Sequence, residues 1–271
     1  MSLIVFSHGN SFPAATYNVL FKNLRSRGFV VKAVDKFGHD PKHPVTNNWP
    51  HLVAQLTEFA QREVEKAAEA AFLVGHSLGG FLSLMCAARH PELARGVLLL
   101  DSPLLGGWKA TALTAMKLTP LVGSLSPGAV SRKRRNSWPT KDAVLEHLRH
   151  KKAFAKWDPQ VLADYVTHCT HDDDNNGRSL SFDRAIETAI YNTLPDNLDR
   201  LLKRHPLKCP AAFIGGRQSL EMQQVGMAMT QQVTRGRIMM LDGSHLFPME
   251  KPVATAAAIE AALRGFDFPP A

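Results

Sequence analysis

The stretch Ala71-Phe72-Leu73-Val74-Gly75-His76-Ser77-Leu78-Gly79-Gly80 places a serine between glycines, directly after an apolar run. Residues 71–74 are typical of a short buried strand, and apolar residues then recur at helical spacing from Phe81 to Ala88. A Gly-x-Ser-x-Gly pattern between a strand and a helix predicts a very tight turn, in which glycines flank the serine and its hydroxyl projects from the backbone. The pattern therefore predicts that Ser77 is a nucleophile.

Two other apolar runs lead into residues that suit a nucleophilic serine. Residues 3–6 lead into Ser7-His8-Gly9-Asn10, and a strand that ends in His-Gly can supply a donor for an oxyanion. Residues 238–241 lead into Asp242-Gly243-Ser244-His245, which puts a histidine in a loop just after a strand. An unassisted serine is a poor nucleophile and needs such a base within hydrogen-bond reach.

These three motifs, in this order along the chain, resemble the α/β-hydrolase superfamily, and the likeness covers about residues 2–102 and 207–264. Apolar runs alternate with helical patterns, which predicts a mostly parallel sheet with helices on both faces. We expect about six strands, because the two strands that usually precede the His-Gly strand in this superfamily are absent. The expected strands cover residues 3–6, 29–34, 71–74, 96–100, 211–214 and 237–241.

Residues 103–206 show helical patterns and no strand pattern, and they interrupt a hydrolase core formed by residues 1–102 and 207–271. The resemblance implies that this insert forms a helical cap over the active site. Its apolar residues suit an acyl pocket, but they equally suit a cap that packs against the sheet, and both interpretations stay open. The pocket residues that we expect are Phe12, His76, Leu104, Trp108 and Leu246.

The resemblance also implies roles around Ser77. His245 is expected to act as the base, because its loop follows the last strand and the active loops lie at the carboxyl edge of the sheet. Backbone N–H groups of Leu78 and Asn10 are expected to form the oxyanion hole, with Ser11 as the fallback for the second donor.

The catalytic acid is where the sequence departs from the superfamily. The usual acid follows the strand near residues 211–214 in a Gly-x-x-Asp context, but residues 215–221 read Gly-Gly-Arg-Gln-Ser-Leu-Glu. Asp101 is the preferred candidate, because some members place the acid after the strand that follows the serine. Glu221 is the fallback, and the absence of a functional acid is the third possibility.

One constellation resembles a calcium loop, with aspartates at positions typical of ligands. Ser179 stands where an apolar residue is usual, and an aspartate replaces the longer glutamate, so that a polar turn explains the same residues. We therefore predict no metal and no cofactor. The residues of this pattern are Asp172, Asp174, Asn176, Gly177 and Asp183.

The formal net charge is +8, and part of it lies in residues 132–135 and in Lys151, Lys152 and Lys156. A solvated basic face explains these residues, and steering of an anionic substrate is the alternative. Nucleic acid is not an expected partner, because aromatic residues do not interleave with the basic ones. Three separated cysteines do not form a disulfide framework, and the lack of a leader or membrane span in this sequence favours a cytoplasmic protein. We expect a monomer or homodimer that acts on a small-molecule substrate.

These observations favour a serine hydrolase that cleaves a carboxylic ester of a small or medium, largely apolar acyl group. A thioesterase or carbon–carbon bond hydrolase acting on an anionic substrate is the alternative. A hydrolase-shaped protein that binds a ligand without turnover also stays open, because the usual aspartate is missing.

Overall fold

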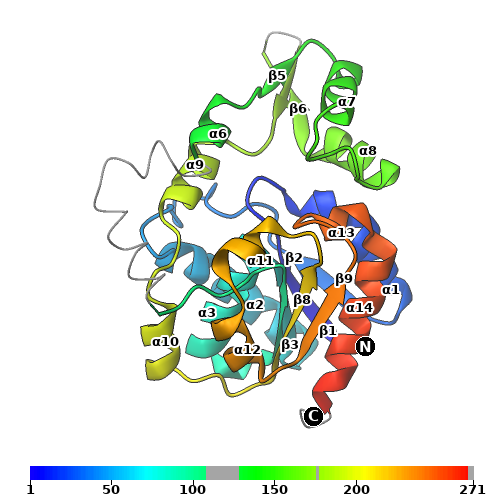
Figure 1. Cartoon of the computed structure of the whole chain (residues 1–271). Coiled ribbons are helices and arrows are strands. Elements are labelled where there is room, and N and C mark those ends of the chain that lie inside the picture. The colour runs from blue at the N-terminus through cyan, green and yellow to red at the C-terminus, as the bar shows by residue number, and fades with distance from the viewer. Residues whose placement is uncertain (108–127, 175–176, 268–271) are drawn as a thin grey trace.

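The computed structural model describes residues 1–107, 128–174 and 177–267 (Figure 1). Within these residues, the centre of the molecule is a six-stranded sheet in the order β2-β1-β3-β4-β8-β9. Neighbouring strands pair in parallel throughout the sheet. The strands are β1 (Leu3–Ser7), β2 (Val30–Ala33), β3 (Ala71–His76), β4 (Ala94–Leu100), β8 (Ala211–Gly216) and β9 (Ile238–Leu241). The six strands and the parallel sheet expected from the sequence are confirmed.

Side chains of each central strand alternate between two apolar layers. In β1, Ile4 and Phe6 belong to one layer, whereas Leu3 and Val5 belong to the other. All four are at most 2% exposed, because helices cover both faces of the sheet. Burial on both faces explains why these strands read as continuous apolar runs in the sequence.

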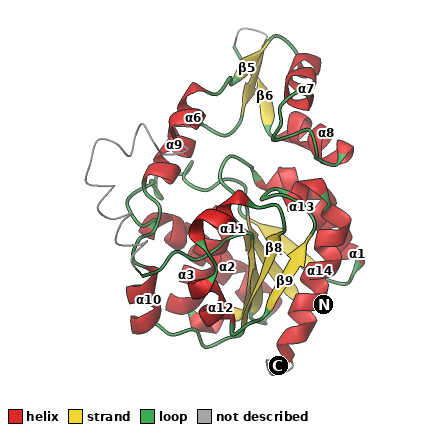
Figure 2. Ribbon diagram, viewed as in Figure 1, coloured by secondary structure: helices red, strands yellow, loops and turns green. Residues whose placement is uncertain are grey.

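Helices α1 and α14 cover one face of the sheet, and α2 and α3 cover the other (Figure 2). The helices of this core are α1 (Asn18–Ser26), α2 (Pro50–Ala67), α3 (Leu78–Arg89), α11 (Leu220–Val225), α12 (Ala228–Thr234), α13 (Phe247–Glu250) and α14 (Pro252–Arg264). In the described part of the chain, no helix combines the length and the apolar character that crossing a bilayer requires.

The segment between β4 and β8 places several elements beyond the carboxyl ends of the strands, in the upper part of Figure 1. Its helices are α6 (Gly128–Lys133), α7 (Lys141–Arg149), α8 (Pro159–His168), α9 (Arg184–Asn192) and α10 (Leu198–Arg204). Two helical patterns that the sequence predicts in this insert, at residues 143–154 and 161–166, overlap α7 and α8. A third predicted pattern, from Leu113 to Leu118, lies outside the described residues.

This segment also contains strands, so the expectation that it lacks them is wrong. Strands β5 (Ser137–Trp138), β7 (Arg178–Leu180) and β6 (Thr170–Asp172) form a small antiparallel sheet in that order. Each strand has only two or three residues. A period-two pattern needs about four residues to be recognised, so such strands leave no signal in the sequence.

Candidate active site

Ser77 forms the turn between β3 and α3 by itself, with φ of 53° and ψ of −117°. A positive φ is unusual for a residue with a side chain and is held here by the packing around it. A Cβ on Gly79 would lie 2.0 Å from the carbonyl oxygen of Ser7, and a Cβ on Gly75 would lie 2.1 Å from the carbonyl of Gly79. The two glycines therefore let α3 begin directly against β1 and β3, and this close packing sets the turn that presents Ser77.

Ser77, His245 and Asp101 form one chain of hydrogen bonds. The Oγ atom of Ser77 lies 3.0 Å from Nε2 of His245, and Nδ1 of His245 lies 2.7 Å from Oδ2 of Asp101. A carboxylate only accepts, so Nδ1 of His245 carries the hydrogen and Nε2 accepts from the serine hydroxyl. The structure thus brings together the preferred nucleophile, base and acid candidates from the ends of three strands.

Asp101 is fully buried and its carboxylate is surrounded by donors. The backbone N–H of Gly216 donates to Oδ1 at 2.7 Å, and the Ser219 hydroxyl donates to Oδ2 at 2.5 Å. Burial acts to raise the pKa of Asp101. The hydrogen bond and charge of His245, with the bonds from Ser219 and Gly216, outweigh burial and hold this pKa below its usual value. Asp101 is therefore a carboxylate at neutral pH.

Glu221 lies beside this chain of hydrogen bonds rather than in it. Its Oε2 atom is 3.8 Å from Nδ1 of His245, and its side chain is 46% exposed. Burial acts to lower the pKa of His245, but the hydrogen bond to Asp101 and the charges of Glu221 and Asp101 outweigh it, and the pKa is raised. Two carboxylates thus act on His245, and Asp101 is the one that accepts its hydrogen bond.

The peptide between Gly9 and Asn10 is fixed by its carbonyl oxygen. This oxygen accepts a bond of 3.2 Å from the N–H of Phe12 and lies 2.8 Å from Nδ1 of His8. Nε2 of His8 accepts from the N–H of Phe37, so Nδ1 carries the hydrogen and donates. In a trans peptide the N–H points opposite to the C=O, so the N–H of Asn10 is held in a set direction.

The other expected oxyanion donor, Leu78, is the first residue of α3. Its N–H therefore has no partner inside the helix and is available to an anion at the helix start. Ser11, the fallback donor, is buried and has a φ of 76°. The side chain of Asn10 is used elsewhere, because its Nδ2 donates to the backbone oxygen of Glu187 at 3.1 Å.

The expectation that His76 lines the substrate pocket is corrected by the structure. His76 is fully buried, with Nδ1 2.7 Å from the Tyr17 hydroxyl and Nε2 2.9 Å from the backbone oxygen of His245. Both ring nitrogens have internal partners, so this side chain presents nothing to a substrate. Its role in the geometry of the site is structural. The sequence indicates neither this role of His76 nor the contact with Tyr17.

The remaining pocket candidates fall into different environments. Phe12 and Leu246 are half-buried, and the ring of Phe12 lies 5.5 Å from that of Trp157 in the insert. Leu104 is only 2% exposed and packs in the layer of α2 and α3, so the interpretation of core packing holds for it. Trp108 lies outside the described residues.

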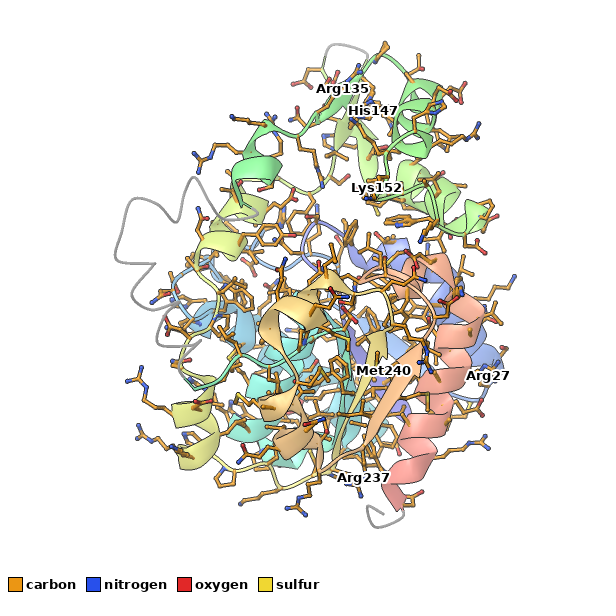
Figure 3. The ribbon with its side chains drawn as sticks, viewed as in Figure 1. Arg27, Arg135, His147, Lys152, Arg237 and Met240 are labelled. Carbon is orange, nitrogen blue, oxygen red and sulfur yellow. The ribbon has the colours of Figure 1, made fainter. Side chains whose placement is uncertain are left out.

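A large open groove of about 1280 Å³ lies away from Ser77. It follows the beginnings of β8 and β9, where Ala211 and Arg237 contribute to its wall. Arg237 lies at the end of the molecule opposite to the insert (Figure 3). Because Ser77 lies at the carboxyl ends of the strands, this groove is not part of the candidate active site.

The described His, Cys, Asp and Glu side chains include one group compact enough to share a metal ion, namely Asp101, Glu221 and His245. Two of these three already satisfy one another by hydrogen bonding, which suits proton transfer better than metal binding. In the calcium-like pattern, Asp172 pairs with Arg178 at 2.6 Å, and Asp183 caps the start of α9. Asn176 of that pattern lies outside the described residues.

The basic run at residues 132–135 is divided between solvent and interior. Arg132, Lys133 and Arg135 are exposed, which agrees with a solvated face, and Figure 3 shows Arg135 on the insert together with Lys152. Arg134 differs from these three residues because it is half-buried. Its Nη1 atom lies 3.4 Å from Oε1 of Glu187, whose side chain is only 5% exposed.

The model of the alpha/beta hydrolase family matches residues 4–258. A monoglyceride lipase homolog of monkeypox virus is 26% identical over 178 residues, which cover 59% of this chain and 62% of the relative. The 2-(acetamidomethylene)succinate hydrolase of Mesorhizobium japonicum is 35% identical over 104 residues, which cover 36% of this chain and 35% of the relative.

Solved structures extend the likeness over nearly the whole chain. A crystal structure of E-2-(acetamidomethylene)succinate hydrolase superposes with a TM-score of 0.72 and 22% identity, and covers 97% of this chain and 91% of its own. At this identity the likeness establishes the fold. The chain covers from 33% to 62% of the length of the curated relatives that it matches.

Proposed function

The chain belongs to the alpha/beta hydrolase family, and we propose that it is a serine hydrolase that cleaves carboxylic esters of small or medium, largely apolar acyl groups. The observation that supports this most is the continuous hydrogen bonding from Ser77 through His245 to the buried carboxylate of Asp101. A hydroxyl, an imidazole and a carboxylate in this order provide a nucleophile, a base and a group that orients the base.

In this mechanism, Nε2 of His245 takes the hydroxyl proton while Oγ of Ser77 attacks the ester carbonyl. Asp101 stabilises the imidazolium that forms, without itself taking the proton. The carbonyl oxygen becomes an oxyanion and accepts hydrogen bonds from the backbone N–H groups of Leu78 and Asn10. Such donors lower the barrier because they are already oriented before charge develops.

Collapse of this intermediate breaks the ester bond, and His245 returns the proton to the departing alcohol. The acyl group is then bound to Ser77. Water attacks this acyl-enzyme with His245 again acting as base, the acid is released, and the hydroxyl of Ser77 is restored. One ester and one water give one acid and one alcohol.

The preference for an apolar acyl group is supported by the aromatic residues next to the oxyanion loop. Phe12 follows Asn10 by two residues, and its ring lies 5.5 Å from Trp157, which in turn lies 4.6 Å from the ring of Phe154. Aromatic rings of this kind supply apolar contact area at one side of a pocket. The similarity to a monoglyceride lipase homolog is consistent with an ester substrate.

A thioesterase or carbon–carbon bond hydrolase that acts on an anionic substrate is the second candidate. The observation that favours it is the position of Arg134 near the oxyanion loop. Arg134 lies near Tyr191, and the side chain of Tyr191 hydrogen-bonds to Ser11, the residue after Asn10. The carboxylate of Glu187 neutralises part of the charge of Arg134, and the positive potential that remains near the oxyanion loop favours a substrate that carries a carboxylate. The likeness to the hydrolase of 2-(acetamidomethylene)succinate points in the same direction. The third possibility, a protein that binds a ligand without turnover, stays a prediction from the sequence. A cytoplasmic location, a monomeric or homodimeric state and a small-molecule substrate also stay predictions from the sequence.

The test is hydrolysis of p-nitrophenyl esters from acetate to decanoate by the wild type and the Ser77→Ala variant. We expect turnover that the substitution abolishes, with a chain-length optimum that measures the acyl pocket. Ser83→Ala is a matched control, because Ser83 is a buried serine of α3 whose hydroxyl makes no hydrogen bond in the described structure. If no ester is cleaved, parallel assays with thioesters and a fluorophosphonate probe decide between the second candidate and a protein without turnover.

A further inference from the structure

A buried chain of hydrogen bonds connects the oxyanion loop to the backbone of the base. The N–H of Gly9 donates to the Tyr17 hydroxyl at 3.0 Å, this hydroxyl lies 2.7 Å from Nδ1 of His76, and Nε2 of His76 lies 2.9 Å from the backbone oxygen of His245. Tyr17 is 2% exposed and His76 is not exposed at all. The chain therefore runs entirely inside the protein.

The direction of every bond in this chain is determined. The backbone oxygen of His245 only accepts, so Nε2 of His76 carries the hydrogen and donates to it. With one hydrogen on a neutral imidazole, Nδ1 of His76 must accept, and the hydroxyl of Tyr17 is its donor. The oxygen of Tyr17 in turn accepts from the N–H of Gly9. Each donor thus has one acceptor.

The surroundings keep His76 in this state. Burial lowers the pKa of His76 to about 3, and the nearby imidazole of His245 acts in the same direction. The ring centres of His76 and His245 lie 5.0 Å apart, with an angle of 39° between the ring planes. A neutral His76 leaves His245 free to become an imidazolium without a second positive charge beside it.

We propose that Tyr17 and His76 are positioning residues, which set the oxyanion loop and the loop of His245 relative to one another. The inference rests on the proposed function, because Gly9 precedes the oxyanion donor Asn10 and His245 is the base in that mechanism. His76 also precedes Ser77 directly, so this one side chain links the nucleophile turn to both other loops. A Cβ on Gly9 would lie 2.9 Å from Nδ1 of His76, which shows how closely the loop approaches the ring.

The chain of bonds acts on the transition state rather than on substrate binding. Without it, the ring of His245 loses its alignment with Asp101 and with Ser77, and small errors in such geometry cost about a hundredfold in rate. We expect His76→Phe to lower kcat by about a hundredfold, and Tyr17→Phe by about tenfold, with KM little changed. His76→Gln, which keeps an amide N–H donor on a flexible side chain, is expected to retain more activity than His76→Phe.

The experiment combines kinetics with a signal that needs no substrate. The pH profile of kcat/KM is measured for the wild type and the three variants, and the downfield proton resonance of Nδ1–H of His245 is recorded by NMR. We expect the variants to lose or broaden this resonance. The acid limb of their kcat/KM profile should move to lower pH, toward the ordinary pKa of histidine, because the pKa of His245 is raised in the wild type. Tyr165→Phe is the control, because Tyr165 is 1% exposed and lies outside the chain of bonds. It is expected to leave the resonance of His245 and the pH profile of kcat/KM unchanged.

Variants of Tyr17 and His76 that keep the wild-type resonance and pH profile would overturn the inference, even with a lower melting temperature. A wild type that cleaves no ester would contradict the proposed function instead. In that case the NMR signal still decides whether His76 and Tyr17 align His245 with Asp101.

Discussion

The hydroxyl of Ser219 donates a 2.5 Å hydrogen bond to Oδ2 of Asp101, the same oxygen that lies 2.7 Å from Nδ1 of His245. Ser219 is the fourth residue of Gly216-Arg217-Gln218-Ser219, the position at which the related Gly-x-x-Asp pattern has its acid. The carboxylate thus comes from the end of β4, and the loop after β8 supplies a donor to it. The loop after β4 and the loop after β8 therefore meet at Oδ2 of Asp101, beside His245.

The first prediction concerns Asp101→Asn. The amide is neutral and can donate to Nδ1 of His245, which favours the tautomer that cannot accept the proton of Ser77. We expect kcat to fall by a factor of about a thousand to ten thousand, with the fold intact by circular dichroism. Asp242→Asn is the control, because Asp242 is an exposed carboxylate that pairs with Lys251. Near-normal turnover in Asp101→Asn, with collapse in Glu221→Gln, would reverse the assignment of the acid.

The second prediction concerns the pH dependence that Glu221 produces. His245 must be neutral to act as base, so activity rises with pH through its pKa, which the charge of Glu221 helps to raise. Glu221→Gln removes this charge, and the acid limb of the kcat/KM profile is expected to move to lower pH. Added salt should shift the wild type in the same direction, because Glu221 is 46% exposed and its charge is screened. A shift to higher pH would contradict this argument.

The third prediction concerns Gly79. In Gly79→Ala, the new Cβ would lie 2.0 Å from the backbone oxygen of Ser7, so α3 must move away from β1 and carry the turn of Ser77 with it. We expect a loss of about 3 kcal/mol or more in the free energy of unfolding, together with loss of activity. Gly265→Ala is the control, because its φ is −66° and, among the described residues other than its chain neighbours, no atom lies within 4 Å of the new Cβ. Denaturant unfolding of both variants measures the difference.

Several parts of this fold could be predicted because they leave long patterns in the sequence. The central strands are mostly apolar because both faces of the sheet are covered there. The proximity of Ser77, His245 and Asp101 follows from parallel strands that end at one edge. The short strands of the insert could not be predicted, because two or three residues show no period.

The buried position of His76 could have been predicted from the alternation of side chains along β3. In β3, side chains alternate, and Phe72 and Val74 lie in the same apolar layer as Tyr17. His76 continues this alternation and faces the same layer, whereas its position beside Ser77 suggested the pocket. The sequence does not show that a tyrosine some sixty positions earlier lies within hydrogen-bond distance of it, since that contact depends on how η1 (Ala14–Tyr17) packs on the sheet.

The contact between Ser219 and Asp101 leads to the fourth prediction, a transfer of the acid from one loop to the other. Ser219→Asp adds a carboxylate at the position of the usual acid. The aspartate side chain is one bond longer than that of serine, whose hydroxyl already contacts the oxygen of Asp101 that binds His245. In the background of Asp101→Asn, we expect this second substitution to restore kcat at least about tenfold, because a carboxylate again accepts from Nδ1 of His245.

Two further variants make the transfer decisive. Ser219→Ala in the same Asp101→Asn background adds no carboxylate and should restore nothing. Ser219→Asp alone places two buried carboxylates together, which disfavours ionisation of one of them, so it is expected to lower stability as the pH rises through that raised pKa. The kinetics of the double variant then decide the matter: if it folds but is no faster than Asp101→Asn, a carboxylate at position 219 does not reach His245, and the geometry of this loop is not interchangeable with that of β4.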